Sequence, residues 1–380
     1  MKDSIGTEKD PAAREWAIHD QVIQVRPWGG GSVYSLPESG EVIAGSEATC
    51  QLRLDDPLVS RQHAAFLRRR SGWTVRDLGS KNGILIDGAH RLEGRLEPGT
   101  ELTIGSVILI AESQQLITLR AFLARLLGWT EARIPDVDRA LRAVRMAASH
   151  RAPLVLSGPG ELALTARALH DRVRGHDKPF ILCDPRRQAS DGSVRSVANR
   201  DDAALALREA FGGSLCFMRR RLPSGIAEVI SEARDPRTRV QLIVCAYEQE
   251  QDEVEAFLSA APITIPPLSE RADEIDRIIS EYAAEAAADL GVVRDSFTDE
   301  DREWVRRHSA ASLPDIEKGT RRLVAVRASQ NISIAAQRLG MAPVSLARWI
   351  ARRGAIQRDP EVVEMEKASR RGRGTPRRSA

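Results

Sequence analysis

The sequence predicts a multidomain protein: an all-β sandwich, then an α/β domain with a helical lid, then a small all-α domain near the C-terminus. Three observations predict this order. Short apolar runs separated by Gly, Pro, Asn and Asp fill residues 20–112, strand-like and helix-like runs alternate from about 115, and the pattern is nearly all helical from 268. At roughly 150 residues per domain, a chain of 380 residues has room for two or three such units.

The composition excludes several classes of protein. Lys and Arg number 56 and Asp and Glu 53, so the net charge of +3 indicates no partner by itself. The longest apolar runs, such as 107–111, are too short to span a membrane, and the first ten residues have no apolar signal segment. The four scattered cysteines argue against a zinc site or a disulfide framework. We therefore expect a cytoplasmic protein that does not associate with a membrane and binds no metal and no cofactor.

Changes in pattern along the chain set the predicted boundaries. The last 14 residues hold six cations and no acid, which predicts a disordered basic tail. The tail either attracts phosphates non-specifically or only keeps the chain soluble. The predicted segments are a flexible arm (1–19), the sandwich (20–115), the α/β core (122–275), the helical lid (276–328), two short helices around a Gly (329–357) and the basic tail (358–380).

Two loop motifs carry the strongest signal in the sandwich. They read Ser60-Arg61-Gln62-His63 and Asp77-Leu78-Gly79-Ser80-Lys81-Asn82-Gly83. A hydroxyl and a guanidinium can donate charge-assisted hydrogen bonds to phosphate, and an Asn amide can pair with a peptide main chain. In order and spacing these motifs resemble the forkhead-associated (FHA) domain, in which loops at one end of an eleven-stranded sandwich bind phosphothreonine peptides.

The resemblance implies a role for each of these loop residues. Ser60 and Arg61 would contact the phosphate, Lys81 would lie beside it, and Asn82 would hold the peptide main chain. Ser80 is either part of this site or a turn residue, and a bracing role is expected for His63.

The sequence departs from the FHA pattern at one position. The family usually carries Gly-Arg at the start of the third strand, and that Arg contacts phosphate; here Ser46 follows Gly45 and Glu47 comes next. Losing one such contact costs about 1.5–3 kcal/mol, or roughly ten- to a hundredfold in affinity. Phosphothreonine binding and phosphate-independent protein binding both stay open. It also stays open whether Arg68 or Arg70 replaces the phosphate contact that is lost at Ser46.

The α/β region resembles the AAA+ domain of sigma-54-dependent activators. The resemblance rests on several motifs in the family's order, among them 126–128, 212–217 and 266–275. A working phosphate loop needs a Lys, and magnesium needs acidic ligands. The positions that the resemblance assigns to this ATPase machinery carry other residues here: Glu161, Met218, Arg219 and Pro314. Tyr247 replaces an expected Asn, residues 257–261 contain no Arg, and the sigma-contacting loop is missing. We expect a scaffold or oligomerisation platform with no enzyme activity.

The segment from Asn331 to Ile350 resembles the Fis-type helix-turn-helix that ends sigma-54 activators. Gly340 would allow the tight turn, and Leu346 and Ile350 would be buried at i, i+4 spacing. The resemblance implies a DNA-binding face on the second helix, consisting of Ser345, Arg348, Trp349, Arg352 and Arg353. The alternative is a helical hairpin that closes the preceding bundle.

Together these features predict a bacterial transcription regulator. The FHA domain would bind a phosphorylated or other protein partner, the degenerate AAA+ core would assemble the chain into a homodimer or higher oligomer, and the C-terminal helices would bind double-stranded DNA. Two alternatives stay open: a phosphothreonine-peptide adaptor without DNA regulation, and an active sigma-54 ATPase. The sequence does not identify the operator, the kinase, the oligomeric state or the direction of regulation.

Overall fold

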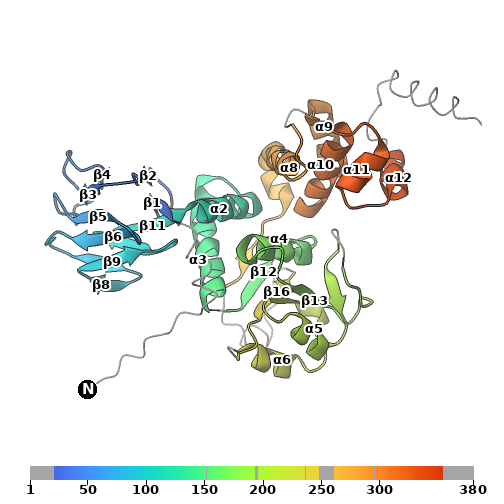
Figure 1. Cartoon of the computed structure of the whole chain (residues 1–380), viewed down its shortest axis with the longest axis horizontal. Helices are drawn as coiled ribbons and strands as arrows, with labels where there is room; N and C mark the ends of the chain where they lie inside the picture. Colours follow the sequence, from blue (N-terminus) through green and yellow to red (C-terminus); the bar gives the residue numbers. More distant parts are fainter. Residues whose placement is uncertain are drawn as a thin grey trace, which may run out of the picture. The chain divides into compact units, whose positions relative to one another are not determined.

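The computed structural model describes residues 21–150, 152–192, 196–235, 237–247, 261–293 and 296–353. They divide into two compact units, Met1–Arg271 and Ala272–Ala380 (Figure 1). The predicted N-terminal arm and basic tail lie outside the described residues.

Residues 22–113 form a β sandwich, which confirms the predicted all-β fold of this region. A six-stranded sheet has the order β2-β1-β11-β10-β7-β8, and a five-stranded sheet has the order β4-β3-β5-β6-β9. Strand β6 shows the alternation that predicted it, because Trp73 and Val75 are buried in the core with Phe66 while Arg76 is exposed. The strands are β1 (Val22–Pro27), β2 (Tyr34–Ser35), β3 (Glu41–Gly45), β4 (Leu52–Arg53), β5 (Ala64–Arg69), β6 (Gly72–Asp77), β7 (Ile84–Ile86), β8 (Ala89–Arg91), β9 (Glu93–Leu96), β10 (Glu101–Ile104) and β11 (Val107–Ser113).

Two helices follow the sandwich without an extended linker. The Ser113 hydroxyl caps α2 (Gln114–Leu127) directly at the end of β11, and a short 3-10 turn, η1 (Glu131–Arg133), leads into α3 (Ile134–His150). One stripe of α3 is apolar and buried and includes Leu141 and Val144. The other stripe is charged and faces the sandwich. Arg142 donates to Glu101 at 2.6 Å and lies 4.2 Å from the ring centre of Trp28.

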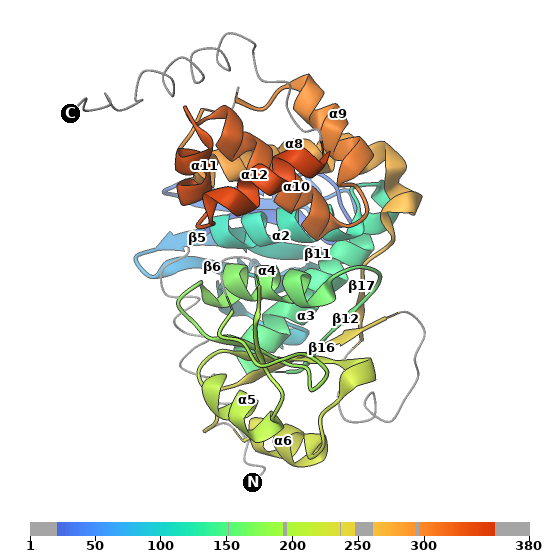
Figure 2. The same ribbon diagram turned by 90° about the vertical axis from the view of Figure 1, so that its right-hand side faces the viewer.

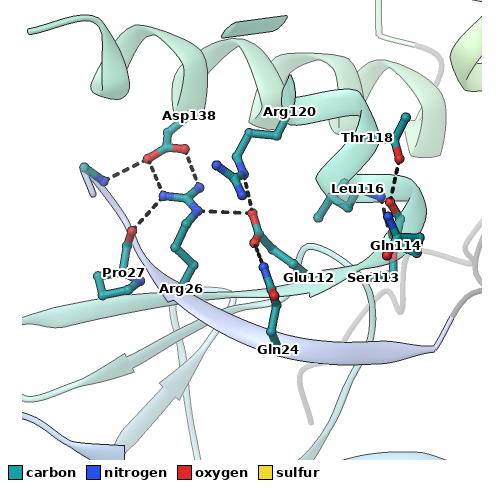
Figure 3. A network of polar contacts seen from close by, with 11 residues as sticks. Gln24, Arg26, Pro27, Glu112, Ser113, Gln114, Leu116, Thr118, Arg120 and Asp138 are labelled. Carbon is teal, nitrogen blue, oxygen red and sulfur yellow. Dashed lines mark hydrogen bonds and ion pairs between the residues drawn. The ribbon is translucent and has the colours of Figure 1, made fainter. Parts of the chain in front are cut away.

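A buried ion network joins this charged stripe to the sandwich (Figure 3). The Arg26 guanidinium on β1 donates to Asp138 on α3 at 2.5 Å and to Glu112 on β11 at 3.1 Å. Glu112 also pairs with Arg120 of α2 at 2.8 Å and accepts from Gln24 at 2.7 Å. Burial by itself would lower the pKa of Arg26, but the hydrogen bond and charge of Asp138, with Glu112, raise it above its usual value. The sequence patterns did not predict this network.

The α/β region of the first unit has a parallel six-stranded sheet, as predicted. Its order is β14-β13-β15-β16-β12-β17. Helices α5 and α6 pack on one face, where Leu207 and Ile230 meet Phe217 and Leu242, and α4 lies on the other face (Figure 2). The elements are β12 (Leu154–Ser157), α4 (Leu162–Arg174), β13 (Phe180–Cys183), β14 (Ala198–Arg200), α5 (Ala203–Glu209), β15 (Ser214–Met218), η2 (Arg219–Arg221), α6 (Ile226–Ala233), β16 (Gln241–Ala246), β17 (Ile263–Thr264) and η3 (Leu268–Glu274).

The burial of His170 on α4 predicts that the stability of the α/β region depends on pH. Its Nδ1 lies 2.8 Å from the Ser214 hydroxyl and its Nε2 3.1 Å from the Lys178 carbonyl. Burial lowers the pKa of His170 from 6.5 to about 4, so the unfolded chain binds a proton at a higher pH than the folded chain does. We expect the free energy of unfolding to fall by about 3 kcal/mol as the pH drops from 6.5 to 4.

Urea denaturation at a series of pH values measures this dependence. The matched control is His170→Gln, which keeps a polar side chain but cannot titrate, so its stability should fall less over the same range. Equal slopes for the two proteins would contradict the prediction.

The second unit is helical, in agreement with the sequence. Polar side chains cap the N-termini of three of its helices. Thr298 forms a capping box at α9, and Ser312 and Asn331 cap α10 and α11. Among the helices that the structure describes, none is long and apolar enough to cross a membrane. The helices are α8 (Ile275–Asp289), α9 (Asp299–His308), α10 (Leu313–Arg327), α11 (Ile332–Arg338) and α12 (Pro343–Arg353).

Candidate functional site

The predicted phosphate-contacting residues come from two loops at one end of the sandwich. Because Ala64 at the start of β5 pairs with Asp77 at the end of β6, the loop before β5 meets the loop after β6. The Ser60 hydroxyl accepts the backbone N–H of Lys81 at 3.1 Å. The Asn82 amide donates to the Leu58 carbonyl at 2.8 Å. The structure therefore brings the two sequence motifs together.

His63 braces both loops from inside the sandwich, as expected. It is fully buried, and its Nδ1 accepts the Ser60 backbone N–H at 3.0 Å. The proton must then be on Nε2, which lies 3.0 Å from the Gly83 carbonyl and donates to it. A neutral imidazole thus connects the two loops and fixes their spacing.

Ser80 is engaged inside its own loop. Its hydroxyl donates to the Asp77 carboxylate at 2.5 Å and accepts the Gly83 backbone N–H at 2.9 Å. Asp77 also accepts the Gly79 and Ser80 backbone N–H groups. These bonds favour the turn role for Ser80 over phosphate contact. The bracing role of Asp77 was not predicted, although an Asp two residues before a Gly is a known turn signal.

The sequence placed Gly45 and Ser46 at the start of the third strand, but Gly45 ends β3 and Ser46 lies in the loop that follows it. This loop lies against the same region. Ser46 donates its backbone N–H to the Ser60 carbonyl at 3.1 Å and its hydroxyl to the Val59 carbonyl at 3.1 Å. A Cβ on Gly45 would lie 2.1 Å from the Arg61 carbonyl oxygen, so only glycine fits there. Ser46 therefore stands beside the predicted phosphate contacts, where the FHA pattern has Arg.

Neither of the two arginines considered as substitutes for that missing Arg lies at this end. Arg68 donates to Gln21 at 2.5 Å, and its guanidinium is 5.8 Å from the ring centre of Trp73. Strand β5 begins at the site with Ala64 and ends at Arg69, so Arg68 is four residues, about 13 Å, away along the strand. Arg70 lies further still, beyond the end of β5.

The remaining predicted contacts are available to a ligand. Arg61, Lys81 and Asn82 are exposed. Within the described residues, no ion pair engages the Arg61 guanidinium or the Lys81 ammonium group. The Ser60 hydroxyl accepts one hydrogen bond and keeps its own proton to donate. Two cations, one hydroxyl and one amide thus share a surface that can bind a phosphorylated peptide.

Comparison with known proteins agrees with this geometry. The family model described as "FHA domain" matches residues 42–110. Residues 42–110 form an FHA domain. A curated relative, the oxoglutarate dehydrogenase inhibitor of Corynebacterium diphtheriae, is 37% identical over 67 residues, which cover 18% of this chain. The match spans 47% of that relative's length.

Solved structures of FHA domains are also similar to part of the chain. One, from a study of phosphothreonine-dependent FHA domain interactions, is 29% identical and covers 23% of this chain and 93% of its own, with a TM-score of 0.23. Another is the FhaA FHA domain complexed with the intracellular domain of Rv3910. It is 30% identical and covers 23% of this chain and 96% of its own, with a TM-score of 0.22.

The structure shows where the positions lie that the AAA+ resemblance assigns to an ATPase. Glu161 is the N-cap of α4, Met218 ends β15 inside the core, and Pro314 stands in the first turn of α10. Arg219 begins η2 and is 8% exposed. The segment expected to carry arginine fingers, 257–261, lies almost entirely outside the described residues.

The structure corrects one residue of the predicted DNA-binding face. Ser345, Arg348 and Arg352 are exposed on α12, but Trp349 is 9% exposed. Its ring packs edge-on against Trp304 of α9 at 5.3 Å. The residue pattern within α12 could not predict this burial, because the partner of Trp349 lies on another helix, α9. The side chain of Arg353 lies outside the described residues.

Proposed function

We propose that the chain binds phosphothreonine-containing proteins through the FHA domain. The observation that carries this proposal is the arrangement of the two loops, in which hydrogen bonds hold Ser60 and Asn82 while Arg61 and Lys81 remain exposed. Guanidinium and hydroxyl donors match the oxygens of a phosphate dianion. The match of residues 42–110 to the FHA family model supports the same ligand class.

Fluorescence anisotropy with full-length protein tests this function. The probes are matched phosphothreonine, phosphoserine and unphosphorylated peptides selected from a phosphothreonine library. We expect binding of the phosphothreonine peptide and loss of binding after phosphatase treatment. Equal affinity for phosphorylated and unphosphorylated peptides would support a phosphate-independent protein-binding module instead.

Restoring the arginine of the FHA pattern should strengthen phosphopeptide binding. The Ser46 backbone is already fixed beside Ser60, so Ser46→Arg places a guanidinium next to the phosphate contacts. One added charge-assisted bond is worth about 1.5–3 kcal/mol, and we expect a gain of about tenfold. Ser46→Lys serves as the control for charge without bidentate geometry and should gain less. An unchanged affinity for Ser46→Arg would contradict this account of the site.

We propose that the α/β region is a scaffold without ATPase activity. A buried Met218 cannot bind magnesium, and the carboxylate of Glu161 stands at the helix end where a phosphate loop would receive a negatively charged phosphate. Magnesium-dependent ATP turnover by the purified chain, abolished by Arg219→Ala, would contradict this proposal.

DNA binding through α11 and α12 is the second candidate function. Gly340 takes a positive φ of 58° between the two helices, and Ser345, Arg348 and Arg352 share one exposed side of α12. From Lys318 to Arg358 the sequence has nine cations and no Asp or Glu. We propose that this region contacts duplex DNA, with two copies of the chain on two half-sites.

Selection against a random duplex pool, with a truncation ending at Ala328 as control, tests DNA binding. We expect Arg348→Ala to weaken binding to the selected site by about tenfold and Arg307→Ala, on α9, to leave it within about twofold. If no sequence is enriched, the adaptor without DNA regulation becomes the better explanation.

A further inference from the structure

Three leucines with exposed side chains lie around the phosphopeptide site. Leu58 is 52% exposed, Leu78 36% and Leu92 81%, and no other leucine among the described residues is as exposed as these. A single exposed leucine is common on any surface. Three at one end of the sandwich, next to a site for an extended peptide, need an explanation.

Leu58 is held beside Asn82. Its backbone N–H donates to the Asp56 carboxylate at 2.8 Å, and its carbonyl accepts the Asn82 amide at 2.8 Å. Asp56 in turn accepts a hydrogen bond from the Ser106 hydroxyl in the turn between β10 and β11. The backbone of Leu58 is therefore fixed on both sides while its side chain is presented to solvent.

Leu78 and Leu92 lie on the other side of the Ser60–Lys81 contact. The Leu78 N–H donates to the His63 carbonyl at 2.9 Å, and the Leu92 carbonyl accepts the Asp77 N–H at 2.8 Å. Both are therefore next to the end of β6. Contacts between the loops follow the order Leu78 with His63, Lys81 with Ser60, and Asn82 with Leu58. Along the two loops, the contact of Ser60 with Lys81 thus lies between Leu58 and Leu78.

We propose that Leu58 on one side, and Leu78 with Leu92 on the other, contact apolar side chains that flank the phosphothreonine of the bound peptide. This inference rests on the proposed phosphothreonine-binding function. Each residue of an extended peptide advances about 3.3 Å, so residues a few positions from the phosphothreonine reach these leucines. The partner is therefore a phosphothreonine segment with apolar neighbours.

An oriented phosphothreonine peptide library, randomised on both sides of the phosphothreonine, identifies the preferred neighbours with wild-type full-length protein. We expect enrichment of Leu, Ile, Val or Met on at least one side. Anisotropy then compares the enriched peptide with a matched peptide that has Ser at the enriched positions. Leu58→Ser or Leu92→Ser should weaken the apolar peptide about five- to tenfold and change the Ser-substituted peptide less than about twofold.

Ile23→Ser is the matched control, because Ile23 is an exposed apolar residue (39%) away from the site. Its neighbour Val22 on β1 pairs with Ser113 at the end of β11, whereas the Ser106 turn next to the site precedes the start of β11. The control variant should leave both affinities unchanged. If a leucine variant does not fold, the wild-type library still decides the question.

The outcomes separate the inference from the function on which it rests. Phosphothreonine-dependent binding without apolar enrichment overturns the inference and leaves the proposed function standing. No binding of any phosphothreonine peptide overturns both. If the leucine variants convert a dimer into a monomer in sedimentation and leave peptide selectivity unchanged, the leucines form a self-association surface and the inference is wrong.

Discussion

Replacing Ser60 and Arg61 together by alanine should lower the affinity of the full chain for a phosphothreonine peptide by a few hundredfold or more. Each side chain contributes a hydrogen bond to a charged phosphate, worth about 1.5–3 kcal/mol. Every 1.4 kcal/mol corresponds to about tenfold in affinity. Ser60→Ala also removes the acceptor for the Lys81 backbone N–H, which helps to hold the two loops together. Titration calorimetry or anisotropy with the selected peptide measures the loss.

Arg69→Ala provides the matched control for this variant. Arg69 is an exposed arginine at the opposite end of β5, so its loss removes one positive charge without touching the loops. We expect less than about twofold change in affinity for this control. A Ser60/Arg61 double variant that still binds within about tenfold of wild type would mean that the phosphate is held elsewhere.

The order of folds could be predicted because local patterns determine it. Strand β6 alternates buried and exposed side chains, and the strands of the α/β sheet are short buried runs between amphipathic helices. Each signal lies within a few neighbouring residues. What these patterns could not predict is the packing of α3 on the sandwich, because Arg26 and Asp138 are 112 residues apart and each is an unremarkable charge in its own segment.

The residues of the candidate site could likewise be predicted where they lie in local motifs, but not where their positions depend on contacts between distant segments. Ser60, Arg61, Lys81 and Asn82 stand in two compact motifs, and the structure brings those motifs into contact. Leu92 was not predictable as a neighbour of this site, since its position depends on the pairing of β9 with β6. Trp349 was misplaced for a similar reason, because its partner Trp304 belongs to another helix. Contacts between distant segments decided each of these cases.

The buried ion network predicts the largest effect on stability. Asp138→Ala should lower the free energy of unfolding of the first unit by about 3–5 kcal/mol, because removing one partner leaves a buried charge under-compensated. The Arg26 side chain is 4% exposed, and Glu112, its other partner, is shared with Arg120 and Gln24. Urea denaturation followed by tryptophan fluorescence measures the loss.

Asp136→Ala is the control on the same helix. Asp136 pairs with Arg139 at the surface, where the two side chains are 32% and 66% exposed, so the expected loss is below about 1 kcal/mol. Arg26→Met combined with Asp138→Leu should recover part of the stability lost in Asp138→Ala, because apolar side chains can replace a buried ion pair. If Asp138→Ala is no less stable than Asp136→Ala, α3 is only a connector and the sandwich folds independently of it. The expected loss would instead mean that α2 and α3 fold as part of the FHA unit, which then extends well beyond residues 42–110.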